Sequence, residues 1–309
     1  MTAKYSILFS LCVLCVSAVQ SFLESCRFSG LIYPMKSRPV GTNAEEHLDY
    51  LVSHARLMLW YARKWALEHS DENFADVLGK RVDIFRLSGC NHNFLDSTAV
   101  SAGDSPEWLK TAAIIKGYFD ETKGDSDSER FEQRCVELLL SGFRARVDRD
   151  LEDIRTAVDL ARYQCGSLRY DLSPSKDNPQ RIGFHIANAC CPSSIFDDPY
   201  YLPGCFLALM GECEAKFGVT EIGTYTWLNS HPKWLEIFPL EWAEHMGPPA
   251  TVVSGNYGFW GQFITARKTF NHKLARKFRE TGVFPYMPRG SWCRIATMRK
   301  QMQKNLPII

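Results

Sequence analysis

The chain has 309 residues, enough for one large domain or two modest ones with an ordinary hydrophobic core. Its 36 Lys and Arg residues are balanced by 35 Asp and Glu residues, which leaves a formal charge of +1. This balance gives no electrostatic basis for a nucleic-acid partner or for binding to an anionic membrane surface.

The N-terminus has the pattern of a signal peptide. Lys4 supplies a positive charge, residues 7–16 form an apolar run, and Val16-Ser17-Ala18 is a small-residue cleavage pattern. The run is shorter than the roughly 20 apolar residues that a membrane helix needs, so no stable membrane insertion is expected. Residues 1–18 therefore predict a secreted protein or one in the lumen of the secretory pathway.

Cysteine content fits an oxidising compartment. The chain has 11 cysteines, and removal of Cys12 and Cys15 with the signal peptide leaves nine. An odd number requires at least one unpaired thiol or an intermolecular bond, and oxidation would pair most of the others. Without a signal peptide the same residues would be ordinary buried thiols.

The first part of the chain is predicted to be helical after an extended lead-in at residues 19–43. Thr42 or Asn43 can cap a helix whose first turn carries Glu45 and Glu46, as the helix dipole favours. Ser105-Pro106 is a typical helix start, and Gly142 is a candidate break in the longest apolar stripe. In chain order the expected helices are 44–69, 71–89, 105–124 and 126–163.

The second part alternates between strand and helix patterns. Strands are expected at 181–186 and 221–229, with a bulged strand at 251–264. Helices are expected at 199–217, at 232–245 with a break near Pro239, and at 271–281. The predicted fold is α+β, in which an N-terminal helical part (44–165) packs on a smaller mixed α/β part (166–309) that carries the site.

His185 is the first candidate for catalysis. It shares a face of its strand with Gly183 and Ala187, which leaves room for a ligand. Asp197 or Asp198 could orient its ring as a general acid or base, with Asn188 holding a substrate oxygen. The alternative is that both aspartates cap the helix that begins near Pro199, and that His185 is structural.

Tyr225, Trp227 and Asn229 are expected on one face of the second strand with Gly223. Tyr and Trp suit the orientation of a ring-shaped substrate, and His231 follows at the strand end as a second proton carrier. The alternative is ordinary core packing for the aromatic residues and a loop position for His231.

A glycine-interrupted segment at residues 255–262 contains Trp260 and Gln262, the next binding candidates. Glycine lets a backbone approach a ligand closely, although a bulged strand in the core explains the segment equally well. Arg279 is the candidate cation for an anionic substrate group, unless it lies on the surface.

Motifs for metals and nucleophiles are weak. The chain has no His-Glu-x-x-His, no matched Cys-x-x-Cys pairs and no Gly-x-Ser-x-Gly. His47 and His54 lie on one helix face and could bind haem or a metal, although core histidines are more common there. A nucleophilic Cys190 or Cys191 beside His185 is a minor alternative.

Taken together, these patterns favour a secreted enzyme that acts on a small polar or aromatic substrate by His–carboxylate acid–base chemistry, with or without a metal. Its expected catalytic residues are His185, Asp197, Asp198, His231 and Tyr225. Its expected substrate-binding residues are Asn188, Trp227, Asn229, Trp260, Gln262 and Arg279. The alternatives are a secreted protein that binds a small ligand, haem or a metal without catalysis, and a structural protein with an aromatic-rich core. Substrate, cofactor and oligomeric state are not specified by the sequence.

Overall fold

The fold is α+β, as the sequence predicts, in a computed structural model that describes residues 43–90, 102–156, 164–253 and 257–306. The predicted signal peptide, Cys26 and nearly all of the lead-in lie outside the described residues. None of the described helices is both long enough and apolar enough to cross a bilayer.

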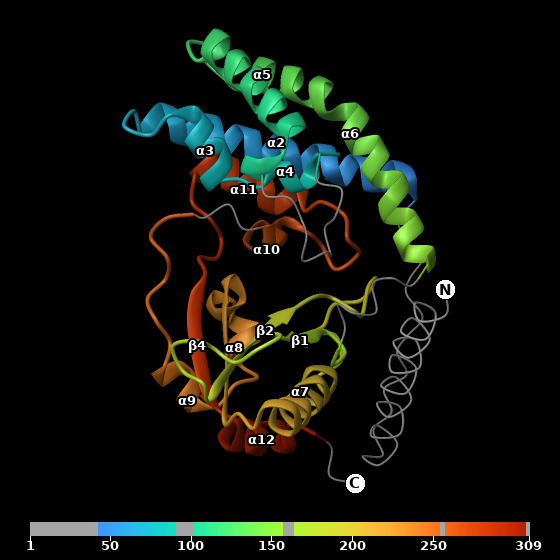
Figure 1. Cartoon of the computed structure of the whole chain (residues 1–309), viewed down its shortest axis with the longest axis vertical. Helices are drawn as coiled ribbons and strands as arrows, with labels where there is room; N and C mark the ends of the chain where they lie inside the picture. The colour runs from blue at the N-terminus through green and yellow to red at the C-terminus, as the bar shows by residue number, and fades with distance from the viewer. Residues whose placement is uncertain (1–42, 91–101, 157–163, 254–256, 307–309) are drawn as a thin grey trace, which may run out of the picture. The chain divides into compact units, whose positions relative to one another are not determined.

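The predicted helices of the first part are present (Figure 1). Side chains of Asn43, Asn73 and Ser105 accept backbone N–H groups in the first turns of three of them, which satisfies donors that a helix start leaves open. The segment expected as one helix at 71–89 is divided into two. The helices are α2 (Ala44–Glu68), α3 (Phe74–Lys80), α4 (Ile84–Leu87), α5 (Pro106–Thr122) and α6 (Glu129–Thr156).

Gly142 does not divide α6, and its role is close backbone packing. A Cβ atom on Gly142 would lie 2.9 Å from the backbone nitrogen of Gly89, and one on Gly89 would lie 2.8 Å from the Cα of Gly142. The two glycines therefore let α6 cross the end of the α4 segment at a distance that a side chain would prevent.

Four strands form a mixed sheet in the order β1-β2-β3-β4. The outer pairs are antiparallel and the central pair is parallel, with Gly183 opposite Gly223. The sequence predicted β2 (Arg181–Ile186) and all of β3 (Glu221–Thr226), but not β1 (Leu168–Tyr170) or β4 (Arg289–Arg294).

Helices α7 (Tyr201–Phe217) and α12 (Ile295–Lys304) pack against each other beside the sheet (Figure 1). Helix α7 ends at Gly218 with φ of 66°, the left-handed cap expected there. The predicted break near Pro239 is confirmed, since α8 (Pro232–Leu235) and α9 (Leu240–Glu244) flank it.

Two strand predictions need correction. Strand β3 ends at Thr226, and Trp227–Ser230 forms a 3₁₀ turn that the Thr226 side chain caps. The predicted bulged strand at 251–264 contains α10 (Tyr257–Trp260) and a 3₁₀ turn at Gly261–Phe263 instead. The helix expected after it is present as α11 (His272–Thr281), and it closes at Gly282 with φ of 67°.

The buried residues of the described ranges form two hydrophobic clusters. The first cluster joins the N-terminal helices to a later segment that includes Trp260, Phe263 and Phe278. The second fills the space between the sheet, α7 and α12. Trp227 packs against both clusters, so the turn after β3 lies where they meet.

Candidate functional site

His185 forms a hydrogen-bonded pair with Asp171. Its Nε2 lies 2.7 Å from Oδ1 of Asp171, and both side chains are accessible, with exposed fractions of 57% and 44%. The hydrogen bond from His185 holds the pKa of Asp171 below its usual value. Asp171 directly follows β1, and its backbone N–H donates to the carbonyl of Gly183 at 2.9 Å. A strand that the sequence did not reveal therefore supplies the carboxylate.

Glycine at position 183 makes room for this pair. A Cβ atom there would clash with Oδ2 of Asp171. Gly223 lies beside it on β3, where an added Cβ would come within 2.9 Å of the Ser291 carbonyl. The strand pairing ends at these glycines, and two residues further along each strand come His185 on β2 and Tyr225 on β3, on the face that the glycines share; Tyr225 is 63% exposed. We call Asp171, Gly183, His185, Gly223 and Tyr225 the His185 face.

Asp197 and Asp198 do not contact His185 and serve the backbone turn before α7. Asp197 accepts the backbone N–H of Ser194 at 2.8 Å, and Asp198 accepts that of Tyr200 at 2.9 Å. Neither aspartate caps α7, whose N-cap residue Tyr200 makes no side-chain capping bond, so the alternative prediction of two helix-capping aspartates is also not met, and both residues stabilise the preceding turn instead.

His231 and Trp227 come together in an aromatic cluster. The imidazole of His231 stacks on Phe196 at a centroid distance of 5.6 Å and lies 4.9 Å from the ring of Tyr286. Trp227 stacks on Tyr286 and donates its indole N–H to Gly258 at 2.9 Å. Burial lowers the pKa of His231, and the positive charge of Lys233 lowers it further.

The three predicted amide side chains hold backbone groups. Asn188 donates to the carbonyls of Ser193 and Ala266, and Gln262 donates to those of Phe259 and Tyr286. Asn229 is fully buried and donates to two carbonyls while its oxygen accepts the indole N–H of Trp234 at 3.0 Å. Asn229 and Gln262 are buried whereas Asn188 is half-buried, and amides whose donors are taken up by backbone carbonyls are typical of structural positions.

Trp260 and Arg279 also occupy structural positions. Trp260 is fully buried in the first cluster. Arg279 binds the carboxylate of Glu132 in a two-pronged contact, with nitrogen–oxygen distances of 2.8 and 2.9 Å. The Glu132 carboxylate therefore already neutralises the charge of this guanidinium and accepts two of its N–H groups, which favours a structural role over substrate binding.

The two histidines considered for haem or metal binding have separate environments. His47 pairs with Asp150 at 2.9 Å. His54 is fully buried, and burial lowers its pKa to about 3. Across the described ranges, no group of three His, Cys, Asp or Glu side chains is placed to hold a metal ion.

None of the eight cysteines in the described ranges forms a disulfide. Burial raises the pKa of Cys191, and it raises that of Cys205 to about 11. A raised pKa keeps a thiol protonated and therefore weakly nucleophilic at neutral pH. The structure thus offers no activated thiol at either of these positions.

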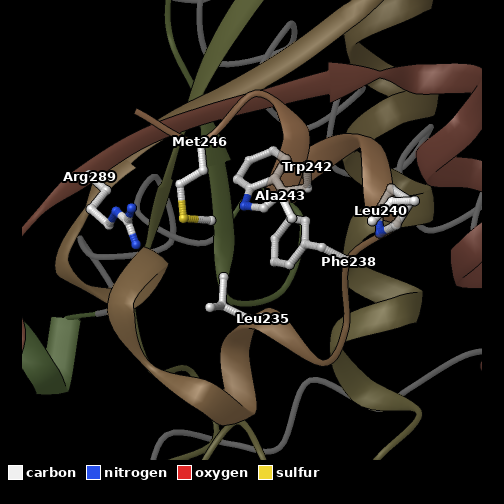
Figure 2. A pocket seen from close by; sticks show the side chains of 8 residues that line it. Leu235, Phe238, Leu240, Trp242, Ala243, Met246 and Arg289 are labelled. Atoms are coloured by element: carbon white, nitrogen blue, oxygen red, sulfur yellow. The ribbon is translucent and has the colours of Figure 1, made fainter. Parts of the chain in front are cut away.

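One hollow was not foreseen from the sequence. It has a volume of about 350 Å³ and lies among α8, α9 and the start of β4 (Figure 2). Its signal in the sequence is the series of large apolar residues after Pro232, a segment whose pattern predicts only short helices. The lining residues are Leu235, Phe238, Pro239, Leu240, Trp242, Ala243, Met246 and Arg289.

Comparison with known protein families, with curated proteins and with solved structures finds no match to this chain.

Proposed function

We propose that this protein is an enzyme that transfers a proton to or from a small polar or aromatic substrate on the His185 face. Its main support is the 2.7 Å contact between His185 and Asp171. A carboxylate bonded to one imidazole nitrogen fixes the tautomer and strengthens the other nitrogen as a base. With Nε2–H donated to Asp171, Nδ1 of His185 carries the lone pair that accepts a proton.

Tyr225 is the complementary proton carrier in this proposal. It lies on the same face as His185 and is accessible to solvent. The side chain of Asp171 fills the space over Gly183, so in this proposal the substrate approaches the exposed outer parts of His185 and Tyr225. Among the residues expected from the sequence, His185 and Tyr225 keep catalytic roles, and Asp171 takes the orienting role given to Asp197 or Asp198.

Replacing His185 with alanine should reduce hydrolysis of an activated aromatic ester, such as p-nitrophenyl acetate, by about 100-fold or more, because the general base is lost. Asp171→Asn should reduce the rate less, since the imidazole remains. The measurement is initial rate against pH for wild type and both variants.

His272→Ala is the matched control, because His272 is also exposed and lies 3.7 Å from a carboxylate, that of Asp49. Its rate should equal that of wild type. If His185→Ala and His272→Ala hydrolyse the ester at the wild-type rate, His185 is not the base for this reaction and the enzyme proposal fails for ester hydrolysis.

A second candidate is a protein that binds a small ligand without chemistry. It is favoured by the hollow at Arg289, which is lined mainly by apolar side chains, as ligand pockets commonly are. The hollow contains none of the residues of the His185 face, so binding there does not depend on the catalytic proposal.

We also propose that the protein enters the secretory pathway, on the basis of the N-terminal pattern alone. Expression in a secreting eukaryotic cell should give a mature chain that starts at Val19. Intact mass spectrometry of the secreted protein checks the cleavage, and the same spectrum before and after reduction counts the disulfides. A chain that retains residues 1–18 would contradict the proposal.

A further inference from the structure

The hollow at Arg289 has an apolar wall, and the polar side chains at its edge are hydrogen-bond donors. Leu235 at the end of α8, Phe238 between α8 and α9, and Met246 in the turn after α9 line it (Figure 2). The rings of Phe238 and Trp242 stack at a centroid distance of 4.1 Å and form a continuous aromatic surface. The polar side chains in the lining belong to Arg289 and Trp242, and neither can accept a hydrogen bond.

Arg289 brings one positive charge to the edge of the hollow. Its Nε donates to the carbonyl of Gly247 at 2.9 Å, which holds the guanidinium in place. Within the described part of the chain, no carboxylate lies within ion-pair distance of it. This sets Arg289 apart from Arg181, Arg279 and Arg294, each of which binds a glutamate.

Trp242 provides a second, independent indication. Its side chain is only 1% exposed, yet among the described residues its indole N–H has no hydrogen-bond acceptor. Figure 2 shows the ring nitrogen on the edge of the ring that faces the space between Met246 and Phe238. Native structures seldom leave a buried donor unpaired, so this N–H is a second donor beside the hollow.

From these observations we infer that the hollow binds a small apolar carboxylic acid as its anion. The single guanidinium matches one carboxylate, whose two oxygens only accept hydrogen bonds. The hydrocarbon part covers Phe238, Trp242 and Met246. A volume of about 350 Å³ is at the lower end of the range for ligand pockets, which restricts the ligand to a short chain or a single ring.

Octanoate and 1-octanol are the probes, because they share a chain length and differ in charge. Isothermal titration should show octanoate binding more tightly than octanol. Arg289→Gln should weaken octanoate binding by about 10- to 100-fold and leave octanol binding unchanged, because it removes a charge-assisted hydrogen bond. Wild-type protein that binds both probes equally would overturn the assignment of a carboxylate.

Two substitutions in α9 test the location. Ala243 lines the hollow and is exposed, so Ala243→Phe should fill the hollow without disturbing the core and abolish binding of both probes. Glu244→Phe adds the same ring one residue away, outside the lining, and should bind both probes as wild type does. Unchanged octanoate affinity in Ala243→Phe, or no binding of either probe to wild type, would overturn the inference. None of these outcomes depends on His185.

Discussion

Replacing Glu132 with alanine should lower the free energy of unfolding by about 3 kcal/mol. The Glu132 side chain is 3% exposed, and it joins three helices. Arg279 from α11 contacts both of its oxygens at 2.8 and 2.9 Å, and Arg56 from α2 donates to it at 3.2 Å. Truncation leaves two guanidinium groups without their carboxylate. Arg279 and Arg56 are 33% and 40% exposed, so water can solvate their charges once the carboxylate is gone. The expected loss of stability is therefore at the low end of the range for breaking a buried ion pair. Urea unfolding followed by circular dichroism measures the loss.

Glu137→Ala is the matched control, because Glu137 lies on the same helix but is exposed. It should change stability by no more than about 0.5 kcal/mol. The double variant Glu132→Ala/Arg279→Ala completes a cycle that isolates the direct interaction. If Glu132→Ala lowers the free energy of unfolding no more than Glu137→Ala does, the ion pairs of Glu132 do not stabilise the fold. The three helices would then be held together by apolar contacts alone.

Helices were predictable from the sequence because their boundary signals are local. Asn43, Asn73 and Ser105 each bond to a backbone N–H three residues ahead, so the cap and its partner are visible in one short segment. Gly218 and Gly282 mark helix ends by the left-handed backbone that they adopt without strain. These features depend little on the rest of the fold.

Two strands were missed, one because it is very short and the other because its partner is distant in sequence. Strand β1 has three residues and pairs with β2, whereas β4 pairs with β3 across more than sixty positions. The sequence Arg289–Arg294 has no clean alternation of apolar and polar residues. The glycine pattern at 255–262 is compatible with a bulged strand and with short helical turns. In the structure the segment forms short helical turns, and Phe259 and Trp260 pack in the first cluster.

The same distinction applies to the candidate site. His185 was identified from the small residues on its own strand, but its partner Asp171 lies 14 residues earlier, beside a strand that left no sequence signal. Asn188, Asn229 and Gln262 have side chains that suit a ligand or a backbone carbonyl equally, so residue type alone could not assign them. Only the tertiary contacts show that carbonyl groups of the chain occupy their amide donors.

The buried histidine His54 should make the protein less stable as the pH falls from about 6.5 toward about 3. Its side chain is fully buried among aromatic rings, and desolvation lowers its pKa to about 3. In the unfolded chain the pKa of histidine is about 6.5. Between these two values the unfolded state binds a proton that the folded state excludes, so acid favours unfolding. At pH 5 the loss from this group is about 2 kcal/mol relative to neutral pH.

Urea unfolding at about pH 7.5 and about pH 5 tests this expectation through a difference between variants. Paired carboxylates such as Asp150, whose pKa is also lowered, lose stability in acid as well, so wild type alone is not informative. His54→Gln removes the titrating group, and wild type should lose about 2 kcal/mol more than this variant between the two pH values. His272→Gln, at an exposed position, should follow wild type. If wild type and His54→Gln lose the same amount, His54 takes up its proton inside the fold, which would require the core around Tyr50 and Trp260 to admit water.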